Sequence, residues 1–140
     1  MIVVVDTNVF VSALRSRSGA SREVLRRCLS GQHRPLMGAA LFFEYEAVLA
    51  RESLFAGTPL NADEREQLFD SVLSVCRWTR IYYTWRPNLR DEADNHLIEL
   101  AVAGGADALV TKNIRDFRGA QLHFPRLQVL RPKQLVKAKE

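Results

Sequence analysis

The feature of this sequence that most constrains its fold is a run of aliphatic residues that stops abruptly at polar ones. Residues 2–5 read Ile-Val-Val-Val, and Asp6, Thr7 and Asn8 follow directly. Four consecutive aliphatic, β-branched residues are typical of a strand buried on both faces, as in the centre of a parallel sheet. We therefore expect a central strand over residues 2–5 with Asp6 at its carboxyl end.

The remaining chain alternates between strand and helix patterns. We predict short strands at residues 36–37, 79–84, 108–111 and 127–130, helices over residues 8–14, 21–31, 39–51, 61–75 and 91–103 and from residue 132 onward, and a turn at residues 116–119. Ser21 and either Asn61 or Asp63 are the expected helix caps. This order predicts an α/β/α sandwich with a mainly parallel central sheet, and the length predicts a single domain over residues 1–140.

The sequence gives little support to secretion or to a membrane location. Asp6 interrupts the first apolar run far short of a signal-peptide core, and no other apolar run is long enough to span a bilayer. Cys28 and Cys76 have neither metal-site nor disulfide spacing, so we expect reduced core thiols. A cytoplasmic protein is the resulting expectation.

The formal net charge of +4 is unevenly distributed. Residues 1–40 carry +4 and residues 111–140 carry +6, whereas residues 41–110 carry −6. This pattern is compatible with nucleic-acid binding if the two basic ends meet in space, and is otherwise ordinary solvated surface.

Acidic residues recur where a parallel sheet would bring them together. Asp6 and Asp116 follow predicted strands, Asp94 lies in the first turn of a helix, and Glu44 lies within a largely apolar helix that also holds Glu46. Groups at the carboxyl ends of parallel strands share one crevice. Two carboxylates about 4 Å apart repel by about 4 kcal/mol at an effective dielectric of 20, which a divalent cation would relieve. Oxygen ligands favour Mg²⁺ (or Mn²⁺), so these four acids predict a metal-dependent phosphodiesterase.

Each acid also has a structural interpretation. Asp6 could cap the following helix, and Glu44 could pair with Arg51 or point into solvent. Asp94 could stabilise a helix dipole, and Asp116 could serve a turn.

Four segments together resemble one known family. They read VVVDTNVFVSAL, LFFEYEAVLAR, DEADNHLIELAVAGGADALVTKNIRDF and LQVLRPKQL. Over essentially its full length the chain resembles PIN-domain nucleases, in particular the VapC-like toxins of toxin–antitoxin pairs. The resemblance implies a PIN-like α/β/α fold and places the first three family acids on Asp6, Glu44 and Asp94. Asn113 stands where many relatives have the fourth acid, and Asp116 substitutes for it in members that share the N-x-x-D-F pattern.

The resemblance also assigns supporting roles. Thr7 and Asn8 would orient Asp6 and its water, and Thr111 and Asn113 would support the site in a similar way. Arg15, Arg17, Lys112 and Arg115 would contact RNA phosphates. Trp85, Arg86 and Arg90 could stack on or clamp single-stranded RNA, or form a plain loop. His33, His96 and His123 match no family ligand, so we expect surface or packed histidines.

The sequence thus predicts an RNA-cleaving toxin with a cognate antitoxin, acting as a homodimer. A nuclease for DNA or for structured substrates is the nearest alternative. A catalytically decayed RNA-binding domain and a phosphoacceptor domain of the receiver type are the others.

Overall fold

Strands and helices alternate along the part of the chain that this computed structural model describes, which is residues 1–81, 95–118 and 124–137. The strands are β1 (Ile2–Val5), β2 (Arg34–Met37), β3 (Arg77–Trp78), β4 (Ala108–Val110) and β5 (Gln128–Leu130). The helices are α1 (Thr7–Arg15), α2 (Ala20–Leu29), α3 (Ala39–Leu49), α4 (Ala62–Val75), α5 (Asn95–Gly104) and α7 (Pro132–Lys137), with short 3₁₀ helices η1 (Glu52–Phe55) and η3 (Ile114–Phe117).

The five strands form one parallel sheet in the order β3-β2-β1-β4-β5. From β1 the chain builds outward through β2 and β3, and then returns to place β4 and β5 on the other side of β1. The strand order therefore reverses between β1 and β4, where open parallel sheets form their binding crevice. Asp6 and Thr111, which follow these two strands, both lie at this switch point.

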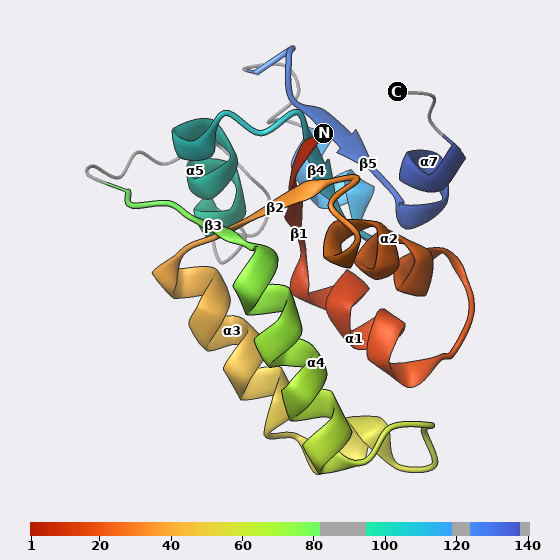
Figure 1. Ribbon diagram of the computed structural model, residues 1–140. Coiled ribbons are helices and arrows are strands. Elements are labelled where there is room, and N and C mark those ends of the chain that lie inside the picture. The colour runs from red at the N-terminus through yellow and green to blue at the C-terminus, as the bar shows by residue number, and fades with distance from the viewer. Residues whose placement is uncertain (82–94, 119–123, 138–140) are drawn as a thin grey trace.

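Helices cover both faces of the sheet, with α5 on one face and α2 and α7 on the other (Figure 1). Val4 belongs to the core cluster that includes Leu97 and Ile98 of α5. Val3 and Val5 point the other way, into the cluster that includes Val24 and Leu135. The first strand is thus buried on both faces, and the predicted α/β/α sandwich is confirmed.

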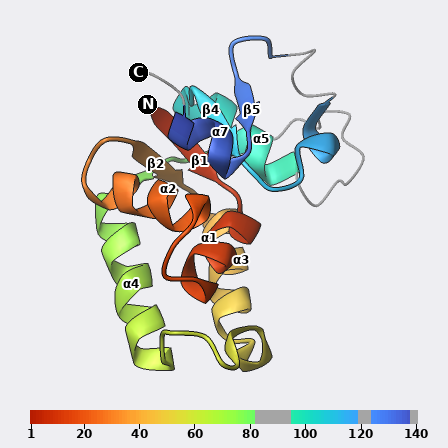
Figure 2. The same ribbon diagram turned by 90° about the vertical axis from the view of Figure 1, so that its right-hand side faces the viewer.

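Helices α3 and α4 extend beyond the sheet on the same side in both views (Figures 1 and 2). An aromatic cluster joins them to α1: the ring centroids of Phe10 and Tyr45 lie 4.4 Å apart, and those of Tyr45 and Phe69 lie 5.9 Å apart. The buried Tyr45 hydroxyl donates a hydrogen bond to the Val5 carbonyl over 2.6 Å. This contact fixes α3, and with it Glu44, against the end of β1.

Three predicted element boundaries were wrong. Ser21 does not cap α2 but lies buried in its first turn, because the helix begins after Gly19, whose φ of 106° suits glycine. The strand expected at residues 79–84 is instead β3 at Arg77–Trp78, because its register follows β2, which ends at Met37. Residues 82–84 lie outside the described part. The expected turn at residues 116–119 begins earlier, as the 3₁₀ helix η3 at Ile114–Phe117, and residue 119 lies outside the described part.

Other local predictions were confirmed. Asn61 caps α4 through a reciprocal capping box with Glu64. Cys28 is a buried free thiol and Cys76 a half-buried one, and burial raises the pKa of each to about 12, so both stay protonated at neutral pH.

Among the described residues, no helix has the length and apolar character needed to cross a membrane.

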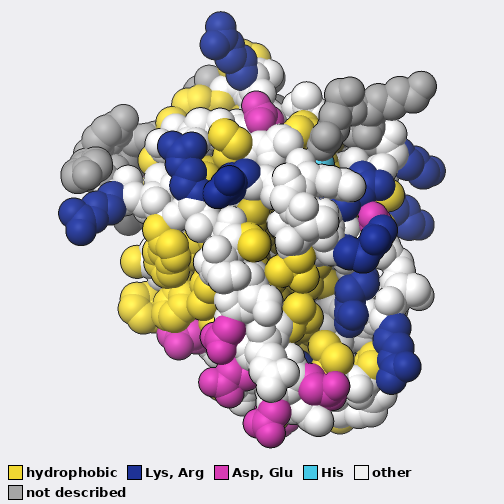
Figure 3. Space-filling view, viewed as in Figure 1, with side chains coloured by type: hydrophobic (Ala, Val, Ile, Leu, Met, Phe, Trp, Pro, Cys, Tyr) yellow, Lys and Arg dark blue, Asp and Glu magenta, His cyan; other side chains and the backbone are white. Residues whose placement is uncertain are grey.

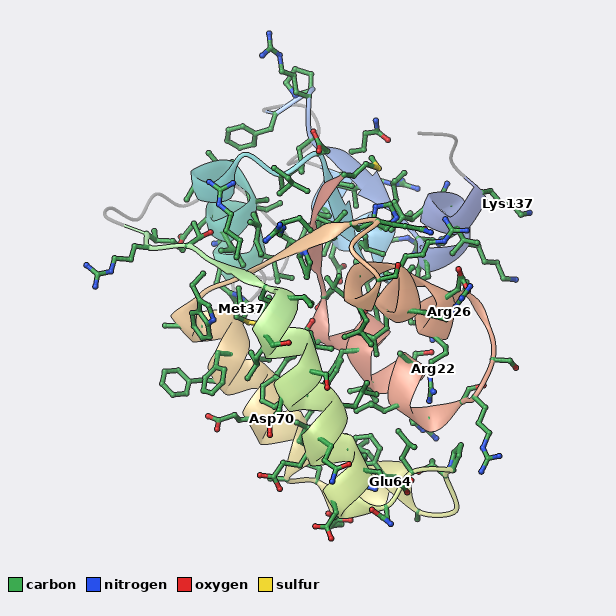
Figure 4. All side chains as sticks on the ribbon, viewed as in Figure 1. Arg22, Arg26, Met37, Glu64, Asp70 and Lys137 are labelled. Atoms are coloured by element: carbon green, nitrogen blue, oxygen red, sulfur yellow. The ribbon has the colours of Figure 1, made fainter. Side chains whose placement is uncertain are left out.

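The two basic ends of the chain meet in space. Helix α2 packs against α7, and Arg27 Nη1 donates a hydrogen bond to the Val136 carbonyl over 3.1 Å. Lysine and arginine side chains gather on this side of the molecule, whereas acidic side chains gather around the lower end of α4 (Figure 3). Arg26 and Lys137 accordingly lie at the right of the view, whereas Glu64 and Asp70 lie toward the bottom (Figure 4). The charge asymmetry along the sequence is therefore also an asymmetry of the folded surface.

Candidate active site

Asp6 is the acid most firmly built into the fold. It follows β1 with extended backbone dihedral angles, at the N-cap position of α1, but its side chain makes no capping hydrogen bond in the described structure. Its Oδ2 instead accepts a hydrogen bond from the buried Thr111 hydroxyl over 2.7 Å. The carboxylate is therefore held by the segment after β4. Capping of α1 does not explain why an acid stands at this position.

Burial makes the charged form of Asp6 unfavourable. The side chain is only 6% exposed. Burial raises the pKa of Asp6 above its ordinary value, the Thr111 hydrogen bond opposes that rise, and the negative charge of Glu44 adds to it. A cation beside Asp6 would favour its ionised form.

Glu44 projects from α3 toward the same place and is held from two sides. Its Oε1 accepts a hydrogen bond from the Thr7 hydroxyl, and its Oε2 lies 2.8 Å from His96 Nε2. The His96 hydrogen bond is the main reason that the pKa of Glu44 is lowered. The described structure contains no ion pair between Glu44 and Arg51, so that alternative is wrong.

Two of the predicted supporting residues act on different partners from those expected. Thr7 was predicted to orient Asp6, but its hydroxyl is bonded to Glu44. Asn8 was predicted to do the same, but its Oδ1 accepts a hydrogen bond from the Lys112 backbone N–H over 3.2 Å. Both side chains therefore tie elements of the site to one another, and the side chain that donates a hydrogen bond to Asp6 is that of Thr111.

These groups open into a cavity of about 790 Å³ at the carboxyl edge of the sheet. Its lining includes the predicted site residues Asp6, Thr7, Asn8, Arg15, Glu44, Lys112, Asn113 and Asp116. Thr111 lies behind this wall and accepts a hydrogen bond from the Asn113 backbone N–H over 3.1 Å. Arg17 and Arg115 are exposed, but neither is among the residues that line the cavity.

The predicted third acid, Asp94, lies outside the described residues, as do Trp85, Arg86 and Arg90. Within the described residues, no three acidic, histidine or cysteine side chains are grouped closely enough to hold a metal ion. The donors that do converge are the carboxylates of Asp6 and Glu44. Two oxygen ligands fit Mg²⁺ or Mn²⁺, since Mg²⁺ keeps several waters and binds through one or two carboxylates.

His96 is the residue of this site that the sequence analysis missed. It lies in the first turn of α5 and contacts Glu44, which is 52 positions away in the sequence. Its place two residues after Asp94 is the only signal in the sequence that could have indicated this contact.

Comparison with known proteins agrees with this geometry. The family model for the PIN domain matches residues 2–115. The chain belongs to the PIN-domain family. PIN domains are nucleases and generally use divalent metal ions, so the expected class of enzyme, a phosphodiester hydrolase, is confirmed at that level.

The fold comparison agrees as well. The structure is similar to a crystal structure of VapBC2 from Rickettsia felis bound to a DNA fragment from their promoter. The TM-score is 0.59 at 16% sequence identity, and the alignment covers 94% of this chain and 98% of that one. At this identity the likeness shows a shared fold. No curated protein sequence matches the chain.

Proposed function

We propose that this PIN domain is an endoribonuclease that hydrolyses RNA phosphodiester bonds with Mg²⁺ (or Mn²⁺), using Asp6, Glu44, Asp94 and Asp116. The observation that carries the proposal is the pair of carboxylates, Asp6 and Glu44, held side by side in a cavity where the buried Asp6 resists ionisation. Asp94 directly precedes α5 in the sequence, and His96 brings that helix against Glu44.

Each part of the site has a distinct task in this proposal. Asp6 and Glu44 bind the metal, which when present supplies a water of lowered pKa and neutralises charge on the phosphate. Thr111, Thr7 and His96 keep the two carboxylates in position.

The basic and polar groups around the cavity would bind the RNA. Arg15 and Lys112 line it and can contact phosphate oxygens. Arg17 and Arg115 are exposed and would contact phosphates further along the strand, outside the cavity itself.

The cellular role that we propose is that of the toxin of a toxin–antitoxin pair. Support comes from the VapC-like motifs and from the similar fold of a VapBC2 complex. The proposal includes a cognate antitoxin, a homodimer and a cytoplasmic location.

The decisive experiment is cleavage of a mixed single-stranded RNA by purified, antitoxin-free protein with Mg²⁺, with Mn²⁺ and with a chelator. We expect metal-dependent cleavage that is lost in Asp6→Asn, Glu44→Gln and Asp94→Asn. Glu46→Gln is the matched control, because Glu46 is exposed on the same helix as Glu44 and does not line the cavity. Cleavage that survives in Asp6→Asn would refute the site. Preferential cleavage of DNA of the same sequence would favour the alternative nuclease.

A catalytically decayed RNA-binding domain is the second candidate, because Asn113 lines the cavity where many relatives have an acid. Calorimetric titration with Mn²⁺ separates the two. A site that is lost in Glu44→Gln supports the nuclease, and RNA binding without metal binding supports the decayed domain.

The receiver alternative has no support in the described sheet. Asp6 directly follows β1, whereas Gly38 follows β2 and Thr111 follows β4. A receiver would need a further acid at one of the neighbouring strand ends.

A further inference from the structure

A second cavity, of about 730 Å³, lies against α5 beside the candidate active site. Its volume is within the range typical of small-molecule sites. The lining includes Ala39, Ala40, Trp78, Arg80, His96 and Glu99. It therefore combines small residues, an exposed aromatic ring, a guanidinium group and a carboxylate.

Glu99 is the unusual member of this wall. It is only 6% exposed, and its Oε1 has no hydrogen-bond partner in the described structure. An unsatisfied buried acceptor is energetically unfavourable, and more so when it is charged. Buried polar groups in folded proteins are nearly always paired. A carboxylate in this state beside a cavity points to a ligand that donates hydrogen bonds.

His96 connects this cavity to the candidate active site. His96 and Glu99 lie three residues apart on α5 and therefore share a face of the helix. The His96 ring lines the cavity, and its Nε2 donates to the ionised Glu44 carboxylate over 2.8 Å. A ligand in the second cavity would thus contact His96, which is hydrogen-bonded to a carboxylate of the proposed metal site.

We propose that this cavity binds an unpaired guanine base of the RNA, next to the phosphate that is cleaved, and that Glu99 reads that base. The inference rests on the proposed nuclease function and adds a preference to it. An ionised carboxylate only accepts hydrogen bonds, and guanine offers two adjacent donors, N1–H and the 2-amino group. Adenine and cytosine place an acceptor beside their amino group, and uracil places its single N–H between two carbonyls.

Trp78 and Arg80 suit the flat faces of the same base. The Trp78 side chain is 55% exposed, although its ring packs against Phe42 with centroids 5.7 Å apart. Arg80 is exposed. Single-stranded RNA bases commonly stack on aromatic rings and on guanidinium planes. These two residues therefore contribute affinity for any base, whereas Glu99 selects among bases.

The test compares two labelled single-stranded RNA pentamers in chelator, where no cleavage occurs. Both pentamers carry adenine at the four outer positions. The central base is guanine in one pentamer and hypoxanthine in the other, and hypoxanthine differs from guanine only in lacking the 2-amino group. We expect wild-type protein to bind the guanine pentamer about tenfold more tightly, because hypoxanthine lacks one of the two hydrogen bonds to Glu99. Glu99→Gln should bring the two affinities together. Trp78→Ala should weaken both by a similar factor and keep their ratio.

Glu66→Gln, an exposed substitution on α4, is the matched control and should keep the tenfold preference. Equal binding of the two pentamers by wild-type protein is enough by itself to overturn the proposal. A preference that survives in folded Glu99→Gln protein also overturns it, and thermal unfolding establishes that the variant is folded.

Cleavage mapping with Mg²⁺ separates this proposal from the nuclease function. Metal-dependent cleavage without a guanine preference refutes the base site alone. A guanine preference in chelator without any metal-dependent cleavage refutes the nuclease and keeps the base site.

Discussion

Replacing Thr111 by valine tests how the fold holds the carboxylate of Asp6. Thr111 is fully buried, donates to Asp6 Oδ2 over 2.7 Å and accepts from the Asn113 N–H over 3.1 Å. Valine has nearly the same shape as threonine. Thr111→Val therefore removes both hydrogen bonds with little change in the packing.

The expected loss of stability depends on the charge of Asp6. A hydrogen bond to a charged group contributes about 1.5–3 kcal/mol, and one between neutral groups about 1 kcal/mol. With Asp6 ionised, the free energy of unfolding should fall by about 2.5–4 kcal/mol once both bonds are counted. The Thr111 hydrogen bond lowers the pKa of Asp6, so its loss matters most when Asp6 is charged. Once Asp6 is protonated, the loss should shrink to about 2 kcal/mol.

The assay is urea unfolding of wild-type and variant protein in chelator, from about pH 4 to about pH 8. Calorimetric titration with Mn²⁺ should in addition show metal affinity weakened by about 10-fold to 100-fold, as for other groups that orient metal ligands. Thr58→Val is the matched control, because its hydroxyl donates to the Phe55 carbonyl over 2.6 Å and no carboxylate is involved. Its effect on stability should not vary with pH.

Two results would refute the reasoning. A loss of stability in Thr111→Val that is the same across the whole pH range would mean that the hydroxyl does not support an ionised Asp6. An unchanged affinity for Mn²⁺ would mean that the orientation of Asp6 does not matter to the metal.

Three further predictions follow from the same contacts. Because burial raises the pKa of Asp6 above 3.8, the contribution of Asp6 to the stability of the metal-free protein should be most favourable below that value and should be lost as the pH rises through the folded pKa. Asp6→Asn should lack this loss and be more stable than wild type at neutral pH in urea unfolding; a less stable variant would contradict the argument. Gly104→Ala would place its Cβ 2.3 Å from Leu36 Cδ1, so it should lower the free energy of unfolding by about 1–3 kcal/mol, measured by calorimetry; a neutral result would show that Leu36 yields easily. Tyr45→Phe removes the hydrogen bond to the Val5 carbonyl and should cost about 1–3 kcal/mol in urea unfolding, with weaker Mn²⁺ binding; unchanged Mn²⁺ affinity would show that this bond does not position Glu44.

The first strand shows why much of the fold was readable from the sequence. Residues 2–5 have no polar alternation, which fits only a strand covered on both faces, and such a strand belongs in the middle of a parallel sheet. Parallel topology then places the residues after β1 and β4 at one edge. The convergence of Asp6 and the segment from Thr111 to Asp116 follows from this alone.

Element boundaries were less predictable, because they depend on neighbours in space. Ser21 has the chemistry of a cap, yet α2 begins one residue earlier, after Gly19. The edge strand β3 ends at Trp78, which pairs with Met37, the last residue of β2. The β-prone sequence pattern continues beyond Trp78.

The sequence by itself thus determined the alternation of strands and helices and the family. It also determined three acids that line the cavity, namely Asp6, Glu44 and Asp116. These follow from local periodicity and from motifs that lie within single segments. Only the tertiary structure decided which side chains touch: Thr111 with Asp6, and Thr7 and His96 with Glu44. It also placed Glu99 beside a second cavity, with an Oε1 that has no hydrogen-bond partner in the described part of the chain. Such pairings depend on the rotation and translation of whole helices against the sheet, and those are set by how the cores on the two faces pack.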